Sequence, residues 1–438
     1  MQHNLKRFSI LSLSQAQRWY FVCLVYYIAL LPFQVKTPPI TLGIMLLGLG
    51  WLLSLRFTDK FKMLATNPAA WLSMAYMLWV VIAATYAPVP REAWKDAFTK
   101  IPFLVWPLLM GSIPALPQQY FRRLLQFFTG ALVVSLITAV SLALWRYLES
   151  EKTGEFFSSR LMCWTVITPH YLGMYLNFAY GILLFYALRQ KFLFHRIVHY
   201  TILGILVLGI WIMAVRIQYV LFILLSGTLL FNGLRQKTGT PFAFMASASA
   251  ATALVIMALS LNPTRSRMVD TYHEIISFEH KVNNKQTNPR KFLWTGAATV
   301  IAKNPWLGNG LATGADSLQE EIEKMPQAIF WDGSKTYHLS ERHYNMHNVY
   351  MQHWAEMGLP GLLLLLGFFL TPVLFRHSSF NSEARLFLLV AAVSFATESM
   401  LERQAGILFF SFFYALFFVV RWQPLPAEEA VPKKATTH

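Results

Sequence analysis

Long apolar runs separated by short polar segments dominate the pattern of this chain. A run of about 17–25 mostly apolar residues can cross a membrane as a helix, and lipid offers no partner for the backbone groups of an open, irregular segment. The pattern predicts twelve such helices, at about residues 18–34, 38–55, 69–86, 99–116, 124–146, 166–187, 200–216, 218–234, 242–261, 350–375, 386–401 and 406–420. We therefore expect an all-α integral membrane protein with both ends on the same side of the membrane.

One long polar insertion, residues 262–347, interrupts this pattern after the ninth predicted helix. Apolar residues recur at helical spacing from Phe292 to Ile301, and a charged surface helix is predicted over residues 316–325. The predicted organisation is an N-terminal segment 1–17, nine helices in 18–261, the external subdomain 262–347, three helices in 348–421 and a polar tail 422–438.

The composition supports this fold class, and the charge orients it. Charged residues make up 13% of the chain, whereas a soluble domain carries about 25%. The net charge is +16. If the N-terminus is cytoplasmic, the cytoplasmic segments hold 18 basic and four acidic residues, a balance of +14. Because Lys and Arg gather on cytoplasmic loops, this charge is a topology signal and no sign of nucleic-acid binding. The insertion then faces outside, into the periplasm of a Gram-negative cell.

Several arginines are predicted near the outer membrane surface. Arg216 stands between two apolar runs that have almost no loop between them, where a charge is costly and usually functional. Arg290 begins the helical part of the insertion, and Arg265 and Arg267 directly follow the ninth predicted helix. Contacts with lipid head groups or with solvent are the alternatives. Several guanidinium groups on one surface suit a diphosphate, which arginine binds in bidentate fashion.

A histidine motif ends the insertion. His347 and Asn348 open the segment HNVYMQHWAEMGLPG, which leads into the tenth predicted helix. A histidine titrates near neutral pH and can therefore serve as a general base. A helix cap or a hydrogen-bonded surface histidine is the alternative, and Asn348 could orient the ring or a substrate. Glu356 would lie about 13 Å further along a helix, so we interpret it as structural.

Signals for a metal or another cofactor are weak. His343 and His347 are four residues apart and could share a helix face, which alone is a poor indication of a metal site. The insertion has no carboxylate pair at metal-ligand spacing, no cysteine cluster, no HExxH motif, no phosphate-binding glycine loop and no nucleophile elbow. We therefore expect neither a metal nor another cofactor.

Taken together, these segments resemble the O-antigen ligase and polymerase superfamily, and the ligase most. The resemblance covers about residues 200–420 and rests on the HN motif, on RKFLWTGAATVIAKNPWLGNGL upstream of it and on Arg216. It implies a GT-C-like membrane fold. It also implies a metal-independent, inverting glycosyltransferase that moves a glycan from undecaprenyl diphosphate to a sugar hydroxyl of lipid A–core. The implied location is the bacterial inner membrane, with the active site facing the periplasm.

The resemblance also assigns roles to residues. The family's two essential arginines correspond to Arg216 and Arg290, and its essential histidine corresponds to His347. These are the predicted catalytic residues. Diphosphate or acceptor contacts are predicted, on physical grounds alone, for Arg265, Arg267, Asn348 and His343.

Other functions stay open at this point. An O-antigen polymerase and a protein O-oligosaccharyltransferase have the same fold, and the motif separates them poorly from a ligase. A lipid or sugar transporter is the alternative from another class. Transporters place their binding charges near the middle of the bilayer, whereas the charges here gather at the outer ends of helices. The expected partners are the two lipid-linked glycans and membrane lipid, without nucleic acid.

Overall fold

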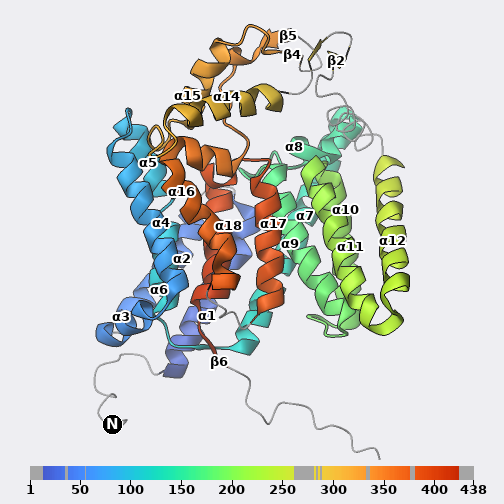
Figure 1. Ribbon diagram of the computed structural model, residues 1–438. Helices are drawn as coiled ribbons and strands as arrows, with labels where there is room; N and C mark the ends of the chain where they lie inside the picture. Colours follow the sequence, from blue (N-terminus) through green and yellow to red (C-terminus); the bar gives the residue numbers. More distant parts are fainter. Residues whose placement is uncertain are drawn as a thin grey trace, which may run out of the picture.

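The computed structural model describes residues 13–34, 38–54, 56–260, 281–282, 285–286, 289–331, 336–374 and 380–423. Most of these residues form helices that run side by side as one bundle (Figure 1). Part of the insertion sits on one end of the bundle, which we call the insertion end. Arg265 and Arg267 lie outside the described residues.

The bundle is built from helices of very different length. They are α1 (Leu13–Leu30), α2 (Pro38–Leu53), α3 (Phe57–Ala65), α4 (Pro68–Thr85), α5 (Pro90–Thr99), α6 (Pro102–Gly111), α7 (Gln118–Ser150), α8 (Ser158–Leu161), α9 (Pro169–Leu188), α10 (Arg196–Met213), α11 (Arg216–Thr238), α12 (Thr240–Ser260), α16 (Val349–Leu374), α17 (Asn381–Phe395) and α18 (Gln404–Tyr414). A π-helical turn, Ala415–Val419, continues α18. At the opposite end, β1 (Leu116–Pro117) and β6 (Trp422–Gln423) pair in parallel.

Each of the twelve predicted membrane segments overlaps a helix, and the prediction of an all-α integral membrane protein is confirmed. Within the described residues, seven helices are long and apolar enough to span a membrane, or eight if the bent pair of α2 and α3 is one span. The remaining predicted segments fall on shorter helices. The helix predicted at 386–401 is displaced toward the N-terminus, because α17 begins at Asn381 and ends at Phe395. This leaves residues 396–399 as a loop at the insertion end.

Helix α9 forms the centre of the bundle. About nine-tenths of its membrane-length window is buried, and it packs against α10, α11 and α17. Two of its polar side chains donate hydrogen bonds inside the protein: the Asn177 amide donates to Gln218 Oε1 at 2.9 Å, and the Tyr175 hydroxyl donates to the Ala405 carbonyl at 2.6 Å. Phenylalanine rings of α9, α17 and α18 fill the remaining space.

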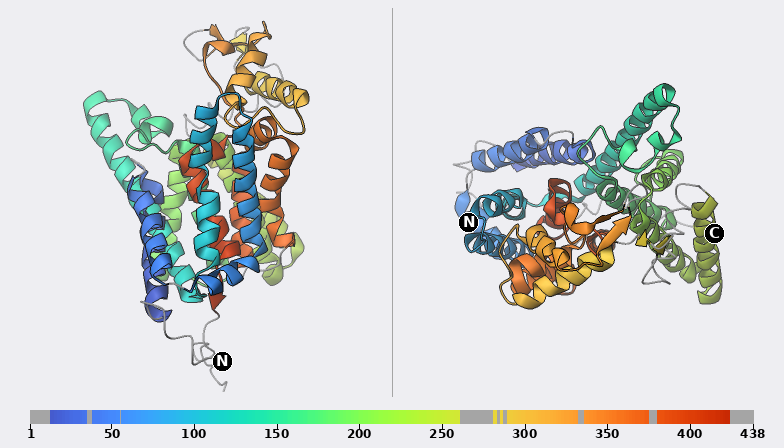
Figure 2. Two further views of the ribbon diagram at one scale, coloured as in Figure 1. Left: turned by 90° about the vertical axis from the view of Figure 1, so that its left-hand side faces the viewer. Right: turned by 90° about the horizontal axis from the view of Figure 1, so that it is seen from above.

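The described part of the insertion has a small core of its own. Helices α14 (Arg290–Lys303) and α15 (Gly314–Glu323) confirm the two helical segments predicted from the sequence. They pack through Leu293, Ala297, Leu318 and Ile322. Strands β4 (Ile329–Trp331) and β5 (Thr336–His338) form an antiparallel pair beside them, and β2 (Lys281–Val282) pairs with β3 (Lys285–Gln286). Figure 2 shows that α14 and α15 cover only one side of the bundle end.

A break in α16 receives the loop that follows α14. At Gly358 the backbone has φ 63° and ψ −168°, and the helix changes course there. A Cβ at this position would lie 2.1 Å from the Trp306 carbonyl oxygen, so only glycine fits. The Leu359 amide donates to the Pro305 carbonyl at 3.0 Å. The loop therefore satisfies a backbone donor at the break.

The glycines of the loop complete the contact. Gly308 also has a positive φ, of 74°, and a Cβ there would lie 2.5 Å from the backbone of Glu356. The amides of Asn309 and Gly310 donate to the carbonyls of Ala355 and Glu356, at 2.9 and 3.0 Å. The NPWLGNG and AEMGLPG segments are thus two halves of one backbone-to-backbone joint.

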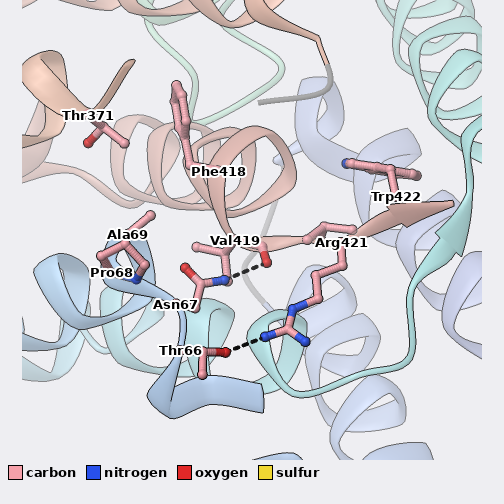
Figure 3. Close-up of a pocket in the computed structure, with 10 residues that line it drawn as sticks. Thr66, Asn67, Pro68, Ala69, Thr371, Phe418, Val419, Arg421 and Trp422 are labelled. Carbon is pink, nitrogen blue, oxygen red and sulfur yellow. Dashed lines mark hydrogen bonds between the residues drawn. The ribbon is translucent and has the colours of Figure 1, made fainter. Parts of the chain in front are cut away.

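A cavity of about 320 Å³ lies at the opposite end of the bundle, beside the turn between α3 and α4 (Figure 3). The Asn67 amide donates to the Val419 carbonyl at 2.8 Å, and the Arg421 guanidinium donates to the Thr66 hydroxyl at 2.8 Å. These polar groups tie the end of α18 to α4. We therefore assign this cavity a structural role.

Replacing Gly358 with alanine should destabilise the protein. The new Cβ would overlap the Trp306 carbonyl, and the positive φ is strained for any residue with a side chain. We expect a loss of about 2 kcal/mol or more in unfolding free energy, seen as a lower thermal midpoint of the purified protein in detergent. Gly130→Ala on α7 is the control, because nothing lies within 4 Å of its Cβ position. Equal midpoints for both variants would refute the joint.

Candidate functional site

The centre of the candidate site is a histidine paired with a carboxylate. His347 Nδ1 lies 3.1 Å from Glu398 Oε2, and the two side chains are 30% and 13% exposed. His347 has a left-handed backbone with φ 45°, and its amide donates to Asn345 Oδ1 at 3.0 Å. Within the described part of the chain, Nε2 of this ring makes no hydrogen bond. One ring nitrogen is therefore held by the carboxylate and the other is available.

Asn348 holds the segments that carry His347 and Glu398 against each other. Its Oδ1 accepts from the Met351 amide at 3.1 Å and so caps the start of α16. Its Nδ2 donates to the Ala396 carbonyl at 3.1 Å, and its backbone amide donates to the Ser399 hydroxyl at 3.3 Å. Asn348 thereby holds the loop that carries Glu398 against the start of α16. These contacts account for its side chain within the protein, and a contact with substrate stays a prediction.

Arg290 joins the group from the insertion. It is the first residue of α14, and its guanidinium donates to the Thr397 carbonyl at 3.2 Å. Burial by itself raises the pKa of the Glu398 carboxyl. The hydrogen bond from His347 and the nearby charges of His347, His170 and Arg290 outweigh burial and lower that pKa below its ordinary value. Glu398 is therefore held as an anion among positive groups.

Arg216 lies at the same end of the bundle. Helix α10 ends at Met213, Ala214 takes a left-handed conformation with φ 52°, and Arg216 begins α11. Arg216 is half-buried. Helix α11 packs against α9 and α17, which carry His170 and lead into the Glu398 loop. The structure thus brings the three predicted catalytic residues to one end of the bundle, and it places two of them around Glu398.

His343 does not belong to this group. Its Nδ1 lies 3.8 Å from Asp316 Oδ1, and its side chain is 70% exposed. The backbone from 343 to 348 is irregular. The idea that His343 and His347 share a helix face is therefore wrong, because four-residue spacing puts side chains on one face only in a helix.

Two residues near the site escaped the sequence analysis. Glu398 fell inside the segment 386–401, which was predicted to be a membrane helix, and His170 is the second residue of α9. The cluster of polar residues in TESMLERQ was the available signal that the apolar run ends early. A lone carboxylate at the end of an apolar run usually has a partner or a function.

A second buried ionic cluster borders the site. It lines a cavity of about 260 Å³, which Asn345 and Gln352 also line. Oxygens of Asp96, Glu356 and Glu402 lie within 4.8 Å of one another. The buried Lys100 ammonium lies 2.5 Å from Asp96 Oδ2 and 3.7 Å from Glu402 Oε1.

This cluster bears on two sequence predictions. Glu356 Oε1 accepts from the Gly314 amide at 3.0 Å, which agrees with a structural role. Carboxylate oxygens are also ligands for Mg²⁺ or Ca²⁺, and here they come from separate segments, so sequence spacing could not reveal them. Lys100 already supplies a positive charge at this place. The absence of a functional metal therefore stays a prediction. Metal binding should be tested at Asp96, Glu356 and Glu402.

The smaller loop between α7 and α9 contains a closed ion-pair network. Glu155 accepts from Arg146 Nε at 3.0 Å and from Arg160 Nη1 at 2.6 Å. Arg146 also donates to the Arg160 carbonyl. Both arginines thus have a structural role in ordering this loop.

One comparison with known protein families covers this region of the chain. Residues 157–366 match a family model described as O-Antigen ligase, and the matched range includes Arg216, Arg290 and His347. No curated protein gives a match. The match supports a role in O-antigen processing in a membrane. The match therefore shows that residues 157–366 are similar to the O-antigen ligase family, and it supports the resemblance to the O-antigen ligase superfamily.

Proposed function

We propose that the protein is an O-antigen ligase: a glycosyltransferase of the inner membrane that moves a glycan from undecaprenyl diphosphate to a sugar hydroxyl of lipid A–core on the periplasmic side. The family domain supports the reaction class. The single observation that carries the mechanism is the meeting of His347, Glu398 and Arg290 at one end of the bundle.

The arginines act on the leaving group. Arg290 and Arg216 stabilise the negative charge that develops on the diphosphate when its bond to the anomeric carbon breaks. Guanidinium groups suit this task, because they bind phosphate oxygens in bidentate fashion and stay charged. The lipid chain of the donor remains in the membrane, which the position of both arginines at helix ends permits.

His347 acts on the acceptor. With the proton of its ring on Nδ1 and directed at Glu398, Nε2 has a lone pair that accepts the proton of the attacking hydroxyl. The acceptor oxygen forms a bond to the anomeric carbon from the face opposite the diphosphate, so the anomer inverts. Glu398 fixes the tautomer and stabilises the imidazolium that results, as a carboxylate does in a catalytic triad. The proton then passes to water.

Transfer in vitro tests the proposed function. The purified chain should join undecaprenyl-diphosphate glycan to lipid A–core, and the rate should not change with EDTA, because arginines supply the positive charge. A loss that added Mg²⁺ or Mn²⁺ reverses would assign a metal to Asp96, Glu356 and Glu402 and overturn the metal-free mechanism.

A deletion strain distinguishes the ligase from a polymerase. Loss of all long chains from lipopolysaccharide, with lipid-linked polymer accumulating, is the ligase outcome. A core that carries one repeat unit would identify a polymerase instead.

Alanine at His347 or Arg290 should abolish most transfer while leaving the protein folded. Loss of the general base in the His347 variant should lower the rate by about 10²- to 10⁴-fold. Loss of the charge at the leaving group in the Arg290 variant should lower it by about 10²- to 10³-fold. Initial rates under saturating donor and acceptor measure both effects. Lys291→Ala, the neighbour of Arg290 on α14, is the comparison for charge removal. Normal glycan attachment in the His347 variant would refute the assigned base.

Glu398→Gln should lower kcat by about 10- to 1000-fold with little change in KM, because the amide no longer fixes the tautomer or balances the imidazolium. Glu320→Gln on the exposed face of α15 is the matched control. A purely structural residue would change the amount of folded protein and leave kcat per folded enzyme in place.

A further inference from the structure

A large basic cavity lies at the end of the bundle opposite His347. Its volume is about 750 Å³, and it opens where α9 and α11 end and α17 begins. Five of its lining residues are cationic: Arg189, Lys191, Arg235, Lys237 and Arg385. None of its lining residues is acidic.

Among the described residues, the positive charges of this cavity have no acidic partner. Within the described residues, none of these five cations forms an ion pair. Arg189 stacks on the Phe185 ring at 4.2 Å, and Arg385 Nε donates to a carbonyl of its own helix. The acidic residue of the first turn of α17, Glu383, is buried and accepts from the Tyr186 hydroxyl at 2.9 Å. The cavity therefore offers positive charge to an anionic ligand.

The rest of the lining is apolar. Leu229 of α11 and Leu386 and Leu389 of α17 lie along the cavity together with Leu188 of α9. From Ser382 to Leu389 the cavity follows α17 for about 10 Å at a rise of 1.5 Å per residue. A soluble anion needs only the basic rim, whereas a lipid uses the basic rim for its head group and the leucines for an acyl chain.

A topology signal alone does not explain this arrangement. Basic residues that orient a membrane protein need only lie on the correct loops. At the same end of the bundle, Arg122 and Arg421 donate to carbonyls of the chain. Arg189, Arg235 and Arg385 come from three separate segments and line one cavity.

We propose that this cavity is a binding site for an anionic phospholipid. The phosphate lies among Arg189, Arg235 and Arg385, and an acyl chain follows the leucines. The three helices that form the cavity are those whose other ends carry His170, Arg216 and the Glu398 loop. A lipid bound here holds these helices together beneath the site.

The test uses the full chain purified in detergent and native mass spectrometry after addition of phosphatidylglycerol or phosphatidylcholine. Wild type should retain one phosphatidylglycerol in preference to phosphatidylcholine. The variant with Arg189→Gln, Arg235→Gln and Arg385→Gln should bind phosphatidylglycerol at least about tenfold more weakly. The control variant removes the same charge elsewhere at that end, by Arg18→Gln, Lys62→Gln and Arg123→Gln, and should bind as wild type does.

Three outcomes would overturn the proposal. They are equal retention by the two variants, equal retention of both lipids by wild type, and complete displacement of phosphatidylglycerol by millimolar inorganic phosphate, which would identify a soluble phosphate as the occupant. If the triple variant does not fold, wild type alone decides. A photoreactive phosphatidylglycerol should label α17 between Ser382 and Leu389, and labelling confined to other helices would refute the site.

Discussion

The joint between the loop 304–314 and the break in α16 is the contact on which the rest of this structure depends. Backbone packs directly on backbone there, because Gly308 and Gly358 each occupy a place where a Cβ would overlap the other segment. Helix α14, which begins with Arg290, leads into the loop, and His347 directly precedes the capped start of α16. The joint therefore helps to set where Arg290 lies relative to His347. Gly308 and Gly358 therefore do more than interrupt helices, because the contact between their segments supports the site.

Charge is distributed differently at the two ends of the bundle. At the insertion end, partly buried carboxylates have cations within reach: Glu398 has His347 and Arg290, and Asp96 and Glu402 have Lys100. Burying a carboxylate without such a partner is costly. At the other end, the cations of the large cavity have no carboxylate partner within the described residues. The first arrangement holds side chains in fixed positions, and the second leaves charge available to a ligand from outside the chain.

The parts of the candidate site that could be predicted are those marked by a single unusual residue in the sequence. An arginine between two apolar runs and a histidine after a polar insertion are rare enough to stand out, and Arg216, Arg290 and His347 all lie at one end of the bundle. Glu398 was hidden by the apolar run around it. The four-residue spacing of His343 and His347 was misleading, since spacing has geometric meaning only when the backbone is helical. The acidic cluster around Lys100 joins segments far apart in the sequence, and no local pattern could have predicted it.

The sequence by itself determined that this is a helical membrane protein, approximately where most of its long apolar helices lie, and that one polar insertion interrupts them. Those properties follow from apolar length and charge placement, which are local and additive. Only the tertiary structure decided which carboxylate faces His347, that the NPWLGNG and AEMGLPG segments interlock, and that cations from α9, α11 and α17 line one cavity. These properties depend on contacts between segments distant in the chain, and such contacts are set by steric fit and by the cost of burying unpaired charge.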